Sequence, residues 1–332
     1  MAAMSTGPLE PPELDYRSTA DRPAFADLPG GVRARLAELA GGAVVADPPV
    51  TSGFTRAYAG RLTLADGSAV FAKAADTSAP HARVAIERES AVLAHLSGRA
   101  TAPRLVGWGA VDEWRLIVME AVDGDMPGMP WTPAAAEATH RACLTAAEVP
   151  PEVVAELTGD LLARDLGSDP VALAILDSLA GGLDPWPGWL TPLTARHRRG
   201  LADLAGHAAT ALAGEQVVHG DLRPDNLVVD DAGTARMVDW NWVSRGPAWV
   251  DFVGLWPLMA HHGLDVTRWH SSPLLAGVDP DAVDAFLAVV VGLMVDKSRG
   301  DDSSPSLKVL RTHQRFTAHT FLALLAGRRR WP

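Results

Sequence analysis

The sequence predicts an α+β fold with a small β-rich first part and a larger α-helical second part. Short apolar runs separated by turn residues fill the chain from about residue 40 to residue 120, as is typical of antiparallel strands joined by hairpins. Longer segments with apolar residues at helical spacing fill most of the chain from there to residue 327. A chain of 332 residues is long enough to bury a substantial core in each part.

The composition excludes several classes of protein. Hydrophobic residues make up 48% of the chain and charged residues 21%, as in ordinary globular proteins. The formal net charge of −11 repels a phosphate backbone and argues against nucleic acid as a partner, whereas it favours a cationic small molecule. No secretion signal and no apolar run of membrane-spanning length is apparent, so we expect a cytoplasmic protein without a membrane partner.

Three features that can indicate special chemistry have simpler interpretations. The lone cysteine, Cys143, excludes an intramolecular disulfide and a cysteine-based zinc site. His261 and His262 are adjacent on an expected helix, so their side chains point apart and do not predict a zinc site. The run Arg328 to Arg330 is expected to form the solvated end of the last helix.

The first part of the chain is expected to contain a flexible arm, two helices and two hairpins. Residues 1–30 are rich in proline and in small or charged residues, which is typical of a mobile arm. The expected helices are residues 31–39 and 79–97, and the expected strands are residues 57–64, 69–74, 104–108 and 115–119.

The second part is expected to begin where Glu120 to Gly124 interrupt the strand pattern. We therefore expect one domain over residues 31–120 and another over residues 121–332. The expected helices of the second domain are residues 133–147, 152–166, 171–179, 195–212, 248–262, 279–297 and 305–327.

The most informative segment runs from His219 to Asn226 and is followed by Asp239. Between them lie two short apolar runs, residues 227–229 and 235–238, joined by a turn rich in aspartate and glycine. If these runs pair as an antiparallel hairpin, residues whose numbers add up to about 465 face each other. Asn226 and Asp239 then lie side by side at the open end of the hairpin.

This arrangement predicts a magnesium site with a base beside it. The amide oxygen of Asn226 and the carboxylate of Asp239 are ligands that Mg²⁺ accepts, with waters and phosphates completing its shell. Asp221, on the loop before Asn226, would lie near the cation without necessarily binding it. A base belongs at that place if a substrate hydroxyl attacks a metal-held phosphate.

The segment resembles the catalytic loop of protein kinases and, more closely, that of the aminoglycoside phosphotransferase and choline kinase-like family. The pattern of that family is H-G-D-x-x-x-x-N followed by I/V-D-W, and the matching residues are His219, Gly220, Asp221, Asn226, Val238, Asp239 and Trp240. Protein kinases usually carry Arg in place of Gly220 and Phe in place of Trp240. This difference, together with the absence of an A-P-E-like segment, favours a small-molecule kinase over a protein kinase.

The resemblance implies a bilobal protein kinase-like fold with a nucleotide-binding N-lobe. In such a fold a flexible turn, here with Ser52 and Gly53, covers the nucleotide, and Lys73 on the second strand contacts its phosphates. A carboxylate on the following helix holds the lysine in place. Glu89 fits the family's E-x-x-x-L register better, and Glu87 is the alternative.

The resemblance also implies a hinge and cofactors. Extended backbone at Glu120 and Val122 would offer N–H and C=O groups to the adenine edge. The expected cofactors are ATP, with GTP as the alternative, and Mg²⁺.

Further roles follow for residues of the C-lobe and the hinge. Arg223 is expected to meet the γ-phosphate, the alternative being a surface arginine paired with an acid. The resemblance implies that His219 orients the loop and that Asp251 steadies it. Trp242 and Asp123 are candidates for the acceptor site, since indole faces stack on sugar rings and attract ammonium groups.

The expected function is therefore transfer of the γ-phosphate of a Mg-nucleotide to a hydroxyl of a small molecule. The acceptor classes that the resemblance implies are a sugar, an aminosugar, an aminoglycoside-like antibiotic or an amino alcohol. The alternative is a catalytically weak, nucleotide-binding regulator with the same fold. The sequence leaves the acceptor and the oligomeric state open.

Overall fold

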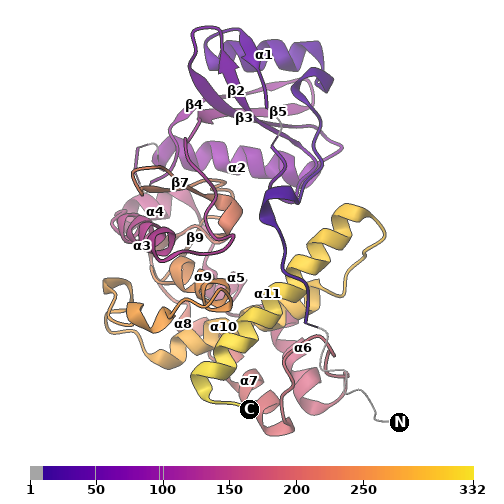
Figure 1. Cartoon of the computed structure of the whole chain (residues 1–332), viewed down its shortest axis with the longest axis vertical. Helices are drawn as coiled ribbons and strands as arrows, with labels where there is room; N and C mark the ends of the chain where they lie inside the picture. The colour runs from indigo at the N-terminus through magenta and orange to yellow at the C-terminus, as the bar shows by residue number, and fades with distance from the viewer. Residues whose placement is uncertain (1–9, 49, 97, 100) are drawn as a thin grey trace. The chain divides into compact units, whose positions relative to one another are not determined.

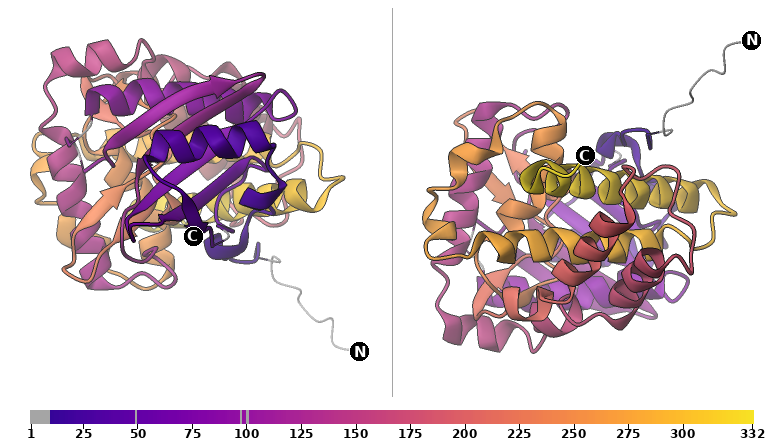
Figure 2. Two further views of the ribbon diagram at one scale, coloured as in Figure 1. Left: turned by 90° about the horizontal axis from the view of Figure 1, so that it is seen from above. Right: turned by 90° about the horizontal axis from the view of Figure 1, so that it is seen from below.

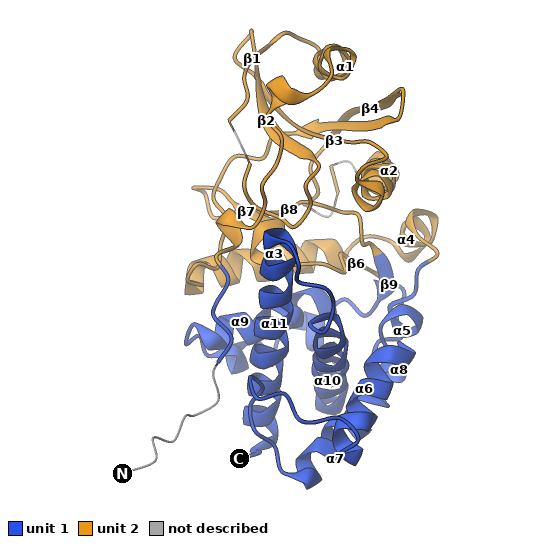
Figure 3. Ribbon diagram, turned by 90° about the vertical axis from the view of Figure 1, so that its right-hand side faces the viewer, with its two compact units in different colours: residues 1–14, 160–216, 244–332 blue, residues 15–159, 217–243 orange. Residues whose placement is uncertain are grey.

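The computed structural model describes residues 10–48, 50–96, 98–99 and 101–332, and the chain divides into two compact units (Figure 3). One comprises Asp15–Gly159 and Val217–Val243, and we call it the sheet unit. The other comprises Met1–Leu14, Asp160–Gln216 and Ser244–Pro332, and we call it the helical unit. The boundary expected near residues 120–124 lies inside the sheet unit, so the division into residues 31–120 and 121–332 remains a prediction.

Five strands of the described chain form one antiparallel sheet in the order β1-β2-β3-β5-β4 (Figure 1). They are β1 (Val44–Ala46), β2 (Tyr58–Leu64), β3 (Ala69–Ala75), β4 (Leu105–Val111) and β5 (Trp114–Glu120). The hairpin of β2 and β3 turns at Asp66-Gly67, as the sequence predicted, whereas β1 was not expected. In this register Lys73 lies between Ala59 of β2 and Ile117 of β5.

Two helices cover opposite faces of this sheet: α1 (Gly30–Ala40) and α2 (Pro80–Leu96) (Figure 1). Because side chains alternate along a strand, Ala72 and Ala74 of β3 join the buried apolar cluster beneath α1, and Lys73 lies on the other face. Val32 and Leu36 of α1 complete that cluster. The alternation of β3 thus directs one lysine away from an apolar core.

The sheet unit also contains two helices and a hairpin from the second part of the chain. These are α3 (Pro133–Ala147), capped by Thr132, α4 (Pro151–Leu157), and the hairpin of β7 (Leu227–Val229) and β8 (Ala235–Met237). The hairpin register pairs Leu227 with Met237, one residue away from the register expected from the sequence. Val238 N accordingly donates to Asn226 O at 3.0 Å, so Asn226 faces Val238 rather than Asp239.

The expected flexible arm of residues 1–30 lies partly outside the described residues, which begin at residue 10. From residue 15 onward the chain forms two short 3₁₀ helices, η1 (Tyr16–Ser18) and η2 (Phe25–Asp27). Tyr16 and Leu28 are buried. This stretch of the expected arm is therefore a packed part of the sheet unit, anchored by its larger apolar residues.

The helical unit is built around α10 (Pro280–Lys297), which packs against α6, α7, α8, α9 and α11. Its remaining elements are α5 (Leu162–Asp165), α6 (Pro170–Gly181), α7 (Ala195–Ala205), α8 (Ala208–Ala211), α9 (Val250–His261), η4 (Val266–Trp269), η5 (Pro273–Leu275), α11 (Pro305–Arg329) and the short strand β9 (Ser244–Gly246). The chain passes from the helical unit to the sheet unit within the short strand β6 (Gln216–Val218). Figure 2 shows α10 and α11 running side by side. Among the described helices, none combines the length and the hydropathy that crossing a membrane requires.

Two helices expected from the sequence are each divided in the structure. The segment 152–166 forms α4 and α5, because Thr158 after α4 is extended, with φ −155° and ψ 141°. The segment 195–212 forms α7 and α8, with Gly206 as the C-cap of α7. Glycine has a low helix propensity, which accounts for the break near Gly206.

Gly124 provides a test of how the segment after β5 is held. It has φ +132°, and an added Cβ would lie 2.4 Å from the carbonyl oxygen of Val229, whose backbone pairs with Asp125. We expect Gly124→Ala to lower the free energy of unfolding by about 3 kcal/mol, from backbone strain together with the loss of this pairing. The measurement is urea denaturation.

Gly67→Ala is the control for this substitution. Gly67 also has a positive φ, of +85°, but an added Cβ there meets open space. We expect a loss of about 1–2 kcal/mol from strain alone. Equal losses for the two variants would contradict the role of the close approach to Val229.

Candidate functional site

A cleft of about 220 Å³ lies within the sheet unit. It is lined by the turn before β2, by β3, by α2, by the end of β5 and by the β7–β8 hairpin with its flanking residues. The residues expected at the site that line it are Ser52, Gly53, Lys73, Glu89, Glu120, Val122, Asn226 and Asp239. Segments far apart in the sequence thus contribute to one cavity.

Lys73 is the centre of the cleft's charge network. Its Nζ lies 2.7 Å from Oε2 of Glu89 and 2.5 Å from Oδ1 of Asp239. The Glu89 side chain is 1% exposed, on the face of α2 that meets the sheet. Glu87 instead pairs with Arg115 at 2.6 Å, and its side chain is half exposed. The structure therefore places Glu89, and not Glu87, on Lys73.

Burial and charge oppose each other in this network. Burial alone would lower the pKa of Lys73, but the carboxylates of Asp239 and Glu89 outweigh it and raise that pKa. Burial raises the pKa of Glu89 in spite of Lys73. Burial would also raise the pKa of Asp239, but Lys73 and Arg223 outweigh this and lower it to about 2. Lys73 and Asp239 are consequently charged at neutral pH.

Asp239 has an unusual backbone and a second polar neighbour. Its φ of +69° lies in the left-handed region, which residues other than glycine seldom adopt. Such strain tends to occur at functional sites. Asn241 donates its Nδ2 hydrogen to Asp239 Oδ1 at 2.6 Å and its backbone N–H to Asp239 O at 2.9 Å. Since Lys73 and Asn241 both reach Oδ1, the other carboxylate oxygen is the one that can meet a cation.

The loop His219–Asn226 holds a compact set of charges. Arg223 donates to Asp221 through Nη1 and to both carboxylate oxygens of Asp225, at 3.0 and 3.2 Å. Arg223 is thus paired with acids, but its side chain is only 18% exposed, so it is not a surface arginine. Asn226 donates its Nδ2 hydrogen to the backbone oxygen of Asp221 at 2.7 Å, which leaves its Oδ1 to accept or to coordinate.

Asp221 has the protonation behaviour of a base that works near neutral pH. Burial raises its pKa to about 6, although Arg223 acts in the opposite direction. General bases are most effective when their pKa lies near the working pH. The loop therefore presents a carboxylate that is ionised at pH 7 and still has an appreciable affinity for a proton.

His219 is buried and acts as a neutral link between the loop and the end of β8. Its Nε2 donates to Val238 O at 2.9 Å, and its Nδ1 accepts from the backbone N–H of Asp221 at 3.4 Å. Its ring packs against Trp240 with 4.7 Å between centroids. Burial lowers its pKa to about 4, and a proton on Nδ1 would break the contact with Asp221.

The described residues that line this cleft do not include His219, Asp221 and Arg223 of the loop, nor three other expected site residues. Asp123 is exposed and pairs with Arg61 at 2.6 Å. Trp242 is 59% exposed and is not part of the cleft lining among the described residues. Asp251 is buried on α9 of the helical unit. The acceptor-site roles of Asp123 and Trp242 and the steadying role of Asp251 remain predictions.

Arg22 and Asn241 are among the polar residues that line the cleft and that sequence reasoning missed. Arg22 belongs to the segment expected to be a flexible arm, and one arginine in a proline-rich stretch gives no signal. Asn241 follows the matched motif by one residue. Its contact with Asp239 depends on the left-handed backbone of that aspartate, which the sequence does not reveal.

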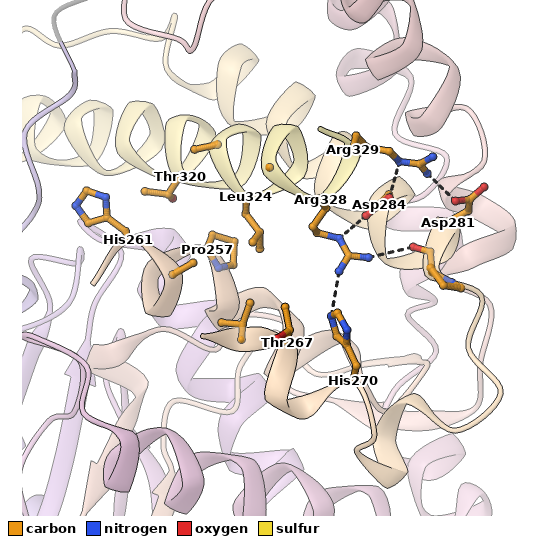
Figure 4. Close-up of a pocket in the computed structure, with 15 residues that line it drawn as sticks. Pro257, His261, Thr267, His270, Asp281, Asp284, Thr320, Leu324, Arg328 and Arg329 are labelled. Atoms are coloured by element: carbon orange, nitrogen blue, oxygen red, sulfur yellow. Dashed lines mark hydrogen bonds and ion pairs between the residues drawn. The ribbon is translucent and has the colours of Figure 1, made fainter. Parts of the chain in front are cut away.

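A second cavity, of about 740 Å³, lies within the helical unit (Figure 4). At its edge the buried Asp284 of α10 lies 2.5 Å from Nε of Arg328 and 2.5 Å from Nε of Arg329, and Asp281 pairs with Arg329 at 2.7 Å. The expectation that Arg328 and Arg329 form a solvated helix end is therefore wrong. They bind α11 to α10, since a buried carboxylate requires a partner. The positive charges of these two arginines therefore stabilise the packing of α11 on α10.

Comparison with known proteins identifies the family. The model of the phosphotransferase enzyme family matches residues 49–280. A search of the curated proteins finds no significant match.

Solved structures show the same fold at low sequence identity. APH(2″)-IIia with GDP and kanamycin has a TM-score of 0.56 at 14% identity, over 87% of this chain and 94% of that chain. A candidate fructosamine-3-kinase from Haemophilus somnus 129PT has a TM-score of 0.53 at 10% identity, over 86% of this chain and 96% of that chain. The macrolide 2′-phosphotransferase MphH from Brachybacterium faecium has a TM-score of 0.50 at 15% identity, over 84% of this chain and 96% of that chain. The α+β fold expected from the sequence, with a β-rich first part and a helical second part, is confirmed.

The neutral state of His219 predicts a pH dependence of stability. Its pKa in the folded protein, about 4, lies below the ordinary value of 6.5, so the folded state binds fewer protons than the unfolded state. His219 therefore contributes stability that is lost as the pH falls from 6.5 toward 4, about 2 kcal/mol between pH 7 and pH 5, and the raised pKa of Asp221, about 6, offsets part of this loss. Denaturation by urea at both pH values measures this loss.

His219→Gln should remove that share of the pH dependence, because glutamine does not titrate. The control is His81→Gln, since His81 is exposed on α2 and should retain the wild-type dependence. An unchanged loss between pH 7 and pH 5 in His219→Gln would show that other groups cause it.

Proposed function

The chain belongs to the phosphotransferase enzyme family, and we propose that it transfers the γ-phosphate of ATP to a hydroxyl group of a small molecule. The observation that carries this proposal is the convergence of five side chains on one cleft or its edge: Lys73 held by Glu89, the carboxylate of Asp239, the amide of Asn226 and the partly buried Asp221 beside it. Together they provide charge for phosphates, ligands for a cation and a base.

The nucleotide is assigned to the side of the cleft formed by the sheet. Lys73 contacts the phosphates, Glu89 holds the lysine, and the turn with Ser52 and Gly53 covers them. The backbone N–H of Glu120 already donates to Arg104 O at 2.8 Å, so Val122 is the residue that offers a backbone N–H to the purine ring of the nucleotide. ATP is the proposed donor and GTP the alternative, since one relative was solved with GDP.

Asn226 and Asp239 are the proposed ligands of Mg²⁺. The Nδ2 group of Asn226 is turned to Asp221, so its Oδ1 can meet a cation, and the carboxylate of Asp239 adds a negative charge. This set of neutral and charged oxygens suits Mg²⁺, which keeps several waters and phosphate oxygens as further ligands. When bound, the cation neutralises charge on the phosphates.

The proposed reaction needs one proton acceptor and a fixed geometry. The acceptor oxygen forms a bond to the γ-phosphorus, and the bond from that phosphorus to the oxygen shared with the β-phosphate breaks. Asp221 receives the proton that the hydroxyl loses. Arg223 positions Asp221 through its Nη1 group and places a positive charge beside the transferred phosphate.

The class of acceptor stays broad in this proposal. One relative was solved with kanamycin and another is a macrolide phosphotransferase, so sugars, aminosugars, aminoglycoside-like antibiotics and amino alcohols are all candidates. The net charge of −11 favours cationic ones among them. A regulator without catalysis is disfavoured because Lys73, Asp221 and Asp239 are all present with their expected surroundings.

Asp221→Asn tests the base. It keeps the shape of the loop but cannot take up a proton, so we expect the rate of phosphate transfer to fall by about a thousand-fold while ATP binding stays nearly unchanged. A coupled assay of ADP release with a panel of hydroxyl acceptors measures the rate. The wild-type rate should also fall as the pH drops below about 6, where Asp221 becomes protonated.

Asp231→Asn is the control, since Asp231 is exposed in the turn between β7 and β8. It should retain wild-type turnover. Undiminished turnover in Asp221→Asn would exclude Asp221 as the base.

Asn226→Ala and Asp239→Asn test the cation site. Each removes one proposed ligand, so we expect the concentration of Mg²⁺ that gives half-maximal activity to rise by about ten-fold or more. Calorimetry with ATP, with and without Mg²⁺, should show that the variants lose mainly the part of the affinity that depends on Mg²⁺. A wild-type response to Mg²⁺ in both variants would place the cation elsewhere.

A further inference from the structure

A segment near the N-terminus runs along the turn that precedes β2. We call residues 15–22 the strap and residues 51–57 the turn. Thr19 N and Ala20 N donate to Thr51 O at 3.0 and 2.8 Å, and Thr19 Oγ1 donates to Gly53 O at 2.6 Å. In return, Thr51 Oγ1 donates to Arg17 O at 2.6 Å. The turn is thus held by hydrogen bonds to a second segment of chain.

Arg22 extends from the end of the strap into the cleft. Its Nη1 donates to Thr55 Oγ1 at 2.9 Å and to Ala57 O at 2.8 Å, and its Nη2 donates to Ser52 O at 2.9 Å. Gly53 makes room for it, because a Cβ at that position would lie 2.5 Å from Nη2. The absence of a side chain at Gly53 therefore lets the guanidinium approach the turn closely.

The guanidinium of Arg22 has donors that the contacts to the turn do not use. An arginine has five N–H groups, and the three contacts to the turn use three of them. Its Nε is buried and has no hydrogen-bond partner. A buried donor without a partner costs free energy, and a guanidinium fits phosphate oxygens through paired N–H groups. Arg22 and Lys73 line the same cleft, so both cationic side chains border the space that the proposed nucleotide would occupy.

We propose that Arg22 is a contact for the phosphates of the bound nucleotide, carried by a segment outside the matched family region of residues 49–280. This inference rests on the proposed function, because it requires a nucleotide in the cleft. The strap also reaches the loop His219–Asn226, since η1 packs against η3 (Pro224–Asn226). Phe54 of the turn lies under the guanidinium of Arg223, 5.0 Å from it. The turn is therefore fixed on two sides, and the guanidinium of Arg22 is held in place before the nucleotide binds.

Calorimetry on the full chain tests this role, with ATP, ADP and adenosine as ligands in the presence of Mg²⁺. Arg22→Met keeps the aliphatic part of the side chain and removes the charge. We expect it to weaken ATP binding by about ten-fold to a hundred-fold and to leave adenosine binding unchanged, because only the phosphates meet the guanidinium.

Arg17→Met is the matched control on the same strap, since the exposed Arg17 side chain pairs only with Asp15 among the described residues. It should bind all three ligands as the wild type does. Arg22→Lys keeps the positive charge but lacks the planar guanidinium whose two Nη groups hold the turn. It should retain more ATP affinity than Arg22→Met. A thermal melt of each variant reports whether it is folded.

The outcomes separate the inference from the proposed function. If Arg22→Met weakened the binding of ATP and of adenosine equally, and Arg22→Lys did not restore it, Arg22 would only hold the turn in place. That result would overturn the phosphate contact. Unchanged ATP affinity in Arg22→Met would overturn it as well. A wild-type protein that binds neither ATP nor GTP would instead overturn the proposed function, and the inference with it.

Discussion

The ion pairs of one largely buried lysine with two carboxylates are the interaction on which the rest of the site depends. Lys73 comes from β3, Glu89 from α2 and Asp239 from the end of the β7–β8 hairpin, so one ammonium group joins three separate elements. Each of the three charges would be costly to bury alone. Of these groups, Lys73 and Asp239 are charged at neutral pH, whereas burial raises the pKa of Glu89.

Much of this arrangement could be predicted from the sequence because short-range patterns determine it. The turn at Asp66-Gly67 sets the register of β2 and β3 and thereby the face on which Lys73 lies. The spacing from Asp221 to Asn226 and Asp239 predicted a loop followed by a hairpin, and the structure has both. The pairing of Glu89 with Lys73, rather than Glu87, agrees with the register preferred from the sequence.

The features that escaped prediction depend on long-range contacts or on individual backbone angles. The hairpin is shifted by one residue, and Asp239 still reaches Lys73 because its backbone turns into the left-handed region. Nothing in the composition of residues 15–28 indicates that they pack, because their apolar residues are few and only the sheet unit gives them partners. Likewise, Arg328 and Arg329 looked like a solvated helix end, because Asp284 is distant in sequence.

The positions of α1 and α10 mean that this protein's folding unit is larger than the region that identifies its family. Residues 49–280 include β2 to β5 but not α1, whose Val32 and Leu36 cover one face of that sheet. They also end at the first residue of α10, the helix around which the helical unit is packed. A fragment cut at those limits would expose one face of the sheet and lose the centre of the other core. Such surfaces promote aggregation, so sequence similarity is a poor guide to where this protein can be divided.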